Sequence, residues 1–143
     1  MKLTIAILSF ALFSTGAFAQ ETKKSFMDTW PELKAFHGVM SETFHPSEEG
    51  NLKPIKTRVK ELNEKAKALV LSEYPAEVNH DLMKEQTIKL SDQVGVLVTM
   101  INEDRNDKEI TDFLSKVHDT FHEIIGLCKH DELGKKEVIE KKK

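Results

Sequence analysis

The segment 51–74 carries the apolar pattern that most restricts how this chain can fold. Its apolar residues recur three and then four positions apart, and most residues between them are Lys, Glu or Asn. This spacing places all of the apolar side chains on one stripe of an α-helix. The segment therefore predicts an amphipathic helix that needs other helices to cover it. The stripe consists of Leu52, Ile55, Val59, Leu62, Ala66 and Leu69.

Three further segments have the same periodicity and are predicted to be helices: 29–46, 75–104, and a last one that opens at Asn106 or Asp107 and weakens beyond Lys129. Each has its own core-facing stripe. The stripes are Trp30, Leu33, His37, Met40 and Phe44 in the first; Ala76, His80, Met83, Thr87, Leu90, Val94, Leu97 and Ile101 in the second; and Ile110, Leu114, Val117, Phe121, Ile124 and Cys128 in the third.

Capping signals support the predicted helix ends. Thr29 followed by Glu32, and Asn106 followed by Glu109, each have the spacing of a capping box at a helix N-terminus. Pro46 is expected to stop the first of these helices. Four amphipathic helices with short connections favour an all-α fold, an antiparallel up-down-up-down four-helix bundle. The bundle domain is expected to span residues 20–134, and residues 135–143 are expected to form a charged, Lys-rich tail.

Residues 1–19 have the three-part pattern of a secretory signal peptide. Lys2 supplies the positive charge, Leu3 to Thr15 supply a short apolar run, and Ala17-Phe18-Ala19 has the small-x-small pattern of a cleavage site. The run is too short to span a bilayer, and no later segment is apolar enough, so no stable membrane insertion is expected. We therefore expect cleavage before Gln20 and a periplasmic or secreted product.

Charge and cysteine content limit the classes of function and of cross-link that this chain can have. The net charge is −3 with acidic and basic residues well mixed, so no basic face indicates nucleic-acid binding. The single cysteine, Cys128, excludes an intrachain disulfide. In an exported protein such a thiol is buried, paired with another chain in a homodimer, or a metal ligand.

Two histidines interrupt the predicted core stripes. His37 and His80 occupy positions where the periodicity calls for apolar residues. Burying an unpaired polar ring costs roughly 2 kcal/mol or more, so each is expected to have a partner. That partner is a metal ion, a haem iron or another side chain, and the sequence leaves the three open.

A second pair of histidines stands one helical turn apart. His118 and His122 have i, i+4 spacing, which brings both rings to the same edge of a helix, where two imidazoles can hold one cation. Helical geometry places both rings at the boundary of the core. The antiparallel topology brings His37 within about two turns of their level.

Together these positions form a candidate ligand set with imidazole, thioether and thiol groups, which favours copper, zinc or nickel over calcium or magnesium. Core filling is the competing interpretation for the two methionines and the cysteine. His45 and His130 are assigned to the surface. The candidate metal ligands are His37, Met40, His80, Met83, His118, His122 and Cys128.

An exported helical bundle of this size resembles the cytochrome b562 and cytochrome c′ group. The c′ type attaches haem through Cys-x-x-Cys-His, whereas this chain has the segment 125–130, Ile-Gly-Leu-Cys-Lys-His, which lacks the first cysteine. The resemblance to the b562 type implies haem b between Met27 and His122 or His130. The chain is also similar to periplasmic metal sensors and metal-resistance proteins in its scattered His and Met residues.

Three functions follow from these observations. The leading hypothesis is an exported, non-catalytic metal-binding bundle that sequesters or senses copper, zinc or nickel. The alternatives are a haem b electron-transfer bundle and a structural or protein-interaction bundle with no cofactor. No nucleophile–base set, phosphate loop or catalytic carboxylate pair indicates an enzyme.

Overall fold

The computed structural model describes residues 25–76, 78 and 80–140, with side chains in the last helix described as far as Cys128. The predicted all-α class is confirmed, since this part of the chain contains five helices and no strand. Residues 1–19, the predicted signal peptide, lie outside it. The helices are α1 (Phe26–Thr29), α2 (Pro31–Glu48), α3 (Lys53–Leu71), α4 (His80–Asn102) and α5 (Asp107–Glu140).

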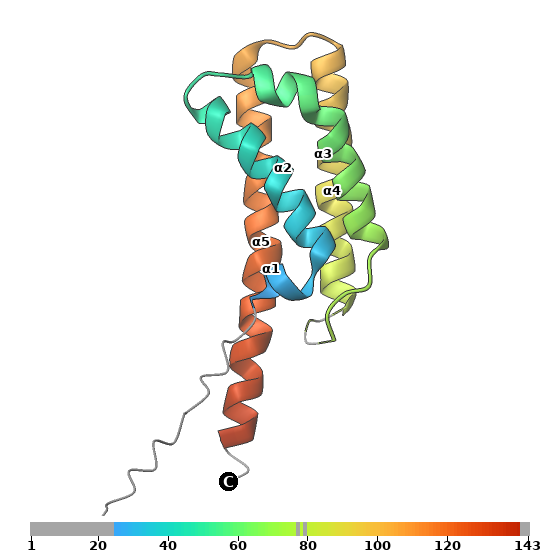
Figure 1. Ribbon diagram of the computed structural model, residues 1–143, viewed down its shortest axis with the longest axis vertical. Coiled ribbons are helices and arrows are strands. Elements are labelled where there is room, and N and C mark those ends of the chain that lie inside the picture. Colours follow the sequence, from blue (N-terminus) through green and yellow to red (C-terminus); the bar gives the residue numbers. More distant parts are fainter. Residues whose placement is uncertain (1–24, 77, 79, 141–143) are drawn as a thin grey trace, which may run out of the picture.

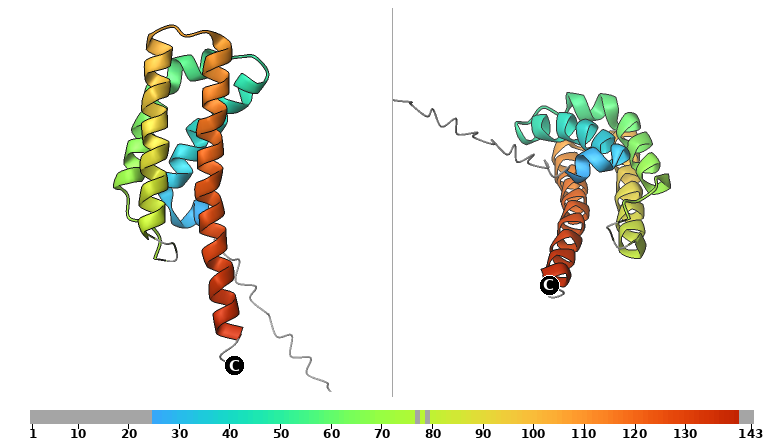
Figure 2. Two further views of the ribbon diagram at one scale, coloured as in Figure 1. Left: turned by 180° about the vertical axis from the view of Figure 1, so that it is seen from behind. Right: turned by 60° about the horizontal axis from the view of Figure 1, so that its bottom comes forward.

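The four longer helices form a ring of neighbours. α2 packs against α3 and α5, and α4 also packs against α3 and α5 (Figure 1). The single-turn helix α1 precedes α2 and was not predicted; Ser25 caps it by accepting a hydrogen bond from the backbone N–H of Met27. α5 continues past the ends of the other helices (Figure 2), so the predicted boundary between residues 134 and 135 lies within one helix.

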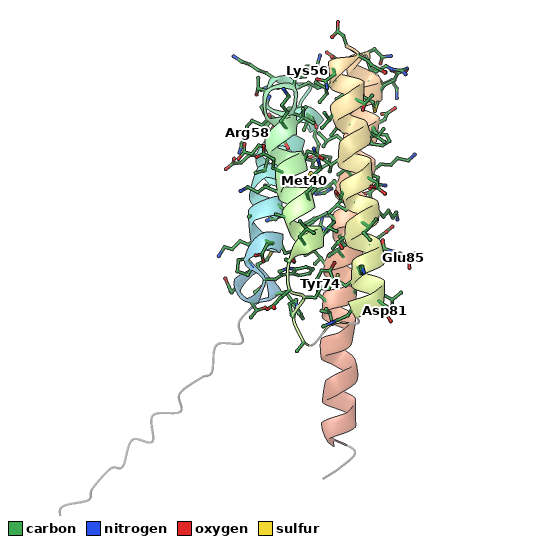
Figure 3. The ribbon with its side chains drawn as sticks, turned by 90° about the vertical axis from the view of Figure 1, so that its right-hand side faces the viewer. Met40, Lys56, Arg58, Tyr74, Asp81 and Glu85 are labelled. Carbon is green, nitrogen blue, oxygen red and sulfur yellow. The ribbon has the colours of Figure 1, made fainter. Side chains whose placement is uncertain are left out.

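The core contains the predicted stripes, with exceptions. Figure 3 shows Met40 inside the bundle, and every apolar residue of the α3 stripe is buried. His37, His80 and Ala76 were predicted to face the core, but all three are exposed. Fully enclosed core residues include Leu33, Phe36, Met40, Ile55, Leu62, Leu69, Met83, Leu90, Leu97, Ile110, Leu114, Val117 and Ile124.

The exposure of both histidines, which were predicted to face the core, has a local cause. Phe36 immediately precedes His37 and is completely buried, and it has far more apolar surface to remove from water. Burial of Phe36 and Val39 turns α2 so that His37 lies outside the core. His80 is the first residue of α4, where its Nε2 lies 3.3 Å from the carbonyl oxygen of Pro75.

The observed helix ends show that two predictions about where helices start and stop are wrong, and they support a third. Thr29 ends α1, and Trp30, which caps α2, makes no side-chain capping bond, so the capping box with Glu32 is wrong. Pro46 does not stop α2; it lies in the last turn, where the lost N–H removes a single hydrogen bond. At the start of α5, Asn106 Oδ1 accepts a hydrogen bond from the backbone N–H of Glu109 at 3.0 Å, as predicted.

One end of the bundle is held by a buried tryptophan. The indole Nε1 of Trp30 donates to Ser72 Oγ at 2.8 Å, and its ring meets the Tyr74 ring edge-on at 5.4 Å. The hydroxyls of Tyr74 and Thr87 lie 2.9 Å apart. Figure 3 shows Tyr74 at the same end of the bundle as Asp81. These contacts join the start of α2, the α3–α4 connection and α4.

The outer surface of the bundle is polar. Arg58 on α3 binds Glu42 of α2 and Glu61 of its own helix, and Lys89 on α4 binds Glu123 of α5 at 2.8 Å. Such exposed pairs contribute little to the stability of the fold, so the buried stripes decide the arrangement. Within the described residues, no helix combines the length and the apolar character needed to cross a bilayer.

Candidate functional site

Four histidines gather where α2 meets α5. His37 and His45 come from α2, and His118 and His122 come from α5. Their rings approach one another through a chain of ring contacts that crosses between the two helices. His118 is half-buried and the other three are exposed, so solvent reaches all four. We refer to these four residues as the histidine cluster.

The two histidines of α5 form its closest pair. The Nε2 atoms of His118 and His122 are 3.2 Å apart, and the rings are nearly perpendicular at 85°. In this geometry one Nε2–H donates to the bare Nε2 of the other ring. Two imidazole nitrogens bound to one tetrahedral ion at 2.0–2.1 Å are themselves about 3.3 Å apart. The pair therefore already has the separation of two ligands on a single metal ion.

Aromatic stacking fixes the cluster across the two helices. The His118 ring of α5 stacks on Phe44 of α2, with centroids 3.9 Å apart. In the reverse direction, the His37 ring of α2 stacks on Phe121 of α5 at 5.2 Å. Both phenylalanines are buried, so each presents a fixed platform to its histidine. As the sequence predicted, His37 lies near the level of the α5 pair.

His45 belongs to the cluster although the sequence argument assigned it to the surface. It is exposed, as predicted, but its ring lies 6.3 Å from that of His118. Its Nδ1 is 3.0 Å from Glu48 Oε2. When Nδ1–H donates to this carboxylate, Nε2 is left with a free lone pair. The available sequence signal was the spacing of His37 and His45, which lie eight residues apart on one side of α2.

Partial burial and mutual repulsion keep two of these rings neutral. Burial lowers the pKa of His118, and electrostatic repulsion from His122 lowers it further, against an opposing effect of Asp119. Burial also lowers the pKa of His37, with smaller contributions from His122 and His45. Both rings are therefore neutral at pH 7, the form in which imidazole binds metals.

These lowered pKa values make folding stability depend on pH. Unfolded His37 and His118 take up protons near the ordinary pKa of about 6.5, whereas the folded rings resist protonation until the pH is lower. We expect the free energy of unfolding to be fully retained above about pH 6.5 and to decrease as the pH falls through the lowered pKa values. Thermal unfolding between about pH 7.5 and about pH 5.5 measures this decrease.

The matched control for this pH dependence replaces both rings. In the double variant His37→Gln, His118→Gln, the decrease in melting temperature over the same interval should be smaller. Carboxylates titrate mostly below about pH 5, so they contribute little in this window. An unchanged slope in the double variant contradicts the assignment of the effect to these two rings.

The other predicted ligands lie elsewhere. Met40, Met83 and Cys128 are completely buried, in positions where they fill the core. Burial is thus the observed state among the three alternatives for the thiol. His80 lies at the start of α4, where its ring meets that of Tyr74 at 6.0 Å. The structure brings together His37, His118 and His122 from the predicted set, and adds His45.

The cluster is not a finished metal centre in the present side-chain arrangement. Across the part of the chain that the structure describes, no three His, Cys, Asp or Glu side chains are grouped closely enough to hold one ion. Of the ligands implied by the b562 resemblance, Met27 is half-buried in α1 and His122 is exposed on α5, while the side chain of His130 lies outside the described residues.

Comparison with protein-family models, with curated proteins and with solved structures finds no match to this chain. The resemblance to the cytochrome b562 type extends as far as an all-helical bundle.

Proposed function

We propose that this protein binds one late transition-metal ion, copper, zinc or nickel, through His118 and His122, and that it sequesters or senses that ion. The observation that carries the proposal is the 3.2 Å separation of the two Nε2 atoms. A metal ion replaces the proton that the two nitrogens share. Imidazole ligands favour these three metals over calcium or magnesium. The proposed setting is an exported antiparallel up-down-up-down bundle in the periplasm or outside the cell.

His45 is the proposed third ligand. Two imidazoles on one tetrahedral ion have ring centroids about 5 Å apart, because each centroid lies about 3 Å from the metal. The centroids of His118 and His122 are 4.5 Å apart, and those of His45 and His118 are 6.3 Å apart. A rotation of the exposed His45 side chain that brings its ring centroid about 1 Å closer to that of His118 closes the difference. Water or His37 then occupies the fourth position.

The outward position of the cluster favours an ion over haem b. A haem held inside a bundle needs an axial imidazole directed at the interior, next to the macrocycle. The exposed His122 ring instead meets His118 at the surface, and the neighbouring interior position is filled by Phe121. A hydrated ion reaches the cluster from solvent without any opening of the core.

The stoichiometry of bound metal tests the proposal. The chain beginning at Gln20, purified without a histidine tag, is exposed to copper, zinc and nickel in turn, desalted and measured by mass spectrometry. One equivalent of one metal, retained by the folded protein, is the expected result. Failure to retain any of the three metals contradicts the proposed function. Addition of hemin to the same preparation, followed by its Soret absorption, tests haem binding separately.

The Glu48 carboxylate, which holds the His45 ring, gives a second prediction about metal affinity. Glu48→Gln keeps the side-chain shape but weakens the acceptor that holds the His45 ring, so metal affinity should fall by about 10- to 100-fold. Competition with a chromophoric chelator measures the change. Glu49→Gln is the matched control, since Glu49 is the exposed neighbour of Glu48 and has no described contact with the cluster. Equal affinities for the two variants contradict the role of Glu48.

A further inference from the structure

We propose that a second copy of this chain docks on the outer face of α3 and α4 and forms a two-fold symmetric dimer. A hollow of about 260 Å³ lies between these helices, away from the histidine cluster. Its lining is mainly apolar, with one basic and one acidic residue. The lining residues are Lys67, Val70 and Leu71 from α3 and Ile88, Ser91 and Asp92 from α4.

Two large apolar side chains at this hollow remain in water. Leu71 is 86% exposed and Ile88 is 40% exposed, although both belong to helices with well-filled core stripes. A single exposed leucine is ordinary, but two large aliphatic residues that share the lining of one hollow form a contiguous apolar surface. Removing such a surface from water favours association.

The charges at the hollow identify the occupant as a second copy. Lys67 lies on α3 and Asp92 lies on α4, so the two helices present opposite signs. Figure 1 shows α3 and α4 running in opposite directions. The step from Lys67 to Leu71 along α3 therefore runs in the same direction as the step from Asp92 back to Ile88 along α4. Both steps are four residues long. The charged pair and the apolar pair thus occupy successive levels of the same groove.

A two-fold axis parallel to the groove makes this surface complementary to itself. Such an axis exchanges the α3 side of one copy for the α4 side of the other. Lys67 then faces the partner's Asp92, and Leu71 faces the partner's Ile88. Each contact occurs twice, as closed two-fold symmetry requires. The surface therefore needs no other protein to satisfy both its charges and its apolar residues.

The α4 side of this face also permits close approach. Gly95 lies one turn beyond Ser91 and therefore on the same side of the helix. A Cβ placed on Gly95 meets no heavy atom within 4 Å, so the space above it is open. Small residues at these two positions leave room for the helix of a second copy.

Sedimentation equilibrium of the chain beginning at Gln20, with EDTA present to remove metal, tests the dimer independently of the metal site. We expect a reversible monomer–dimer equilibrium. Lys67→Glu and Asp92→Lys should each weaken dimerisation at least tenfold, because each variant places like charges face to face. Lys116→Glu on α5 is the matched control and should leave the equilibrium unchanged. Circular dichroism checks that every variant stays folded.

Mixing the two variants separates this interface from any other. Lys67→Glu and Asp92→Lys chains, each of which dimerises weakly alone, should form mixed dimers, since both charge pairs across the two-fold axis are then attractive. A wild-type chain that stays monomeric at all concentrations overturns the proposal. A wild-type dimer that neither variant weakens, or variants that mixing fails to rescue, also overturns it, because the contact then lies on another face.

Discussion

A chain in which His118 and His122 are both replaced by alanine is expected to lose metal affinity by roughly a hundredfold or more, while its helicity remains unchanged. The two rings supply the only pair of nitrogens in the described cluster that already has ligand separation, 3.2 Å. Neither ring is part of the buried core, so their removal leaves the apolar stripe of α5 intact. Isothermal titration with the metal identified by mass spectrometry measures the affinity, and circular dichroism measures the helicity.

The matched control removes two histidines that lie outside the cluster. His80 lies at the start of α4, and His130 follows the last described side chain of α5. The double variant His80→Ala, His130→Ala should bind metal with nearly the affinity of the unmodified chain. Similar losses in both double variants would show that histidine content, rather than the cluster, determines binding.

The largest loss of stability is expected from Trp30→Ala. The indole is only 1% exposed, so its removal leaves a cavity and takes away the donor to Ser72 Oγ, whose hydroxyl still donates to the Leu69 carbonyl oxygen. Truncation of a buried aromatic residue typically costs about 3–5 kcal/mol. For a domain of this size, the melting temperature should fall by about 10–20 °C. Thermal and urea unfolding, each followed by circular dichroism, measure the two quantities.

Trp30→Phe separates packing from hydrogen bonding. The phenyl ring keeps most of the buried area and the edge-on contact with Tyr74, but it cannot donate to Ser72. The expected cost is about 1–2 kcal/mol. If both variants were equally destabilised, the hydrogen bond would matter more than the buried volume, and the packing argument for this end of the bundle would be wrong.

Periodicity was sufficient to predict most of the core. In α3 the apolar residues are surrounded by Lys, Glu and Asn, so only one stripe can face inward, and all of it is buried. In α2 the choice was ambiguous, because Phe36 and His37 are neighbours and either can continue a three-four series. The size of the phenyl ring decided the rotation of the helix. The Phe36 ring packs 5.7 Å from that of Phe121 of α5, a contact that the α2 sequence alone does not contain.

The α5 pair and the level of His37 were visible in the sequence, whereas the place of His45 in the cluster was not. His118 and His122 are brought together by their own helix, so an i, i+4 spacing predicts their approach. His45 reaches the cluster because α2 crosses α5 where Phe44 stacks on His118, and this depends on how two distant segments pack. The helix α1 was missed for another reason: it is a single turn, too short to show a periodicity.

The approach of His45 to His118 has a consequence for folding. α2 and α5 are the first and last long helices, so an ion held by these two residues ties together points roughly 70 residues apart along the chain. Such a tie restricts the unfolded chain in the way that a disulfide does, and a loop of this length corresponds to about 4 kcal/mol. A chain with a single buried cysteine would thus gain a reversible staple, present only while the metal is supplied.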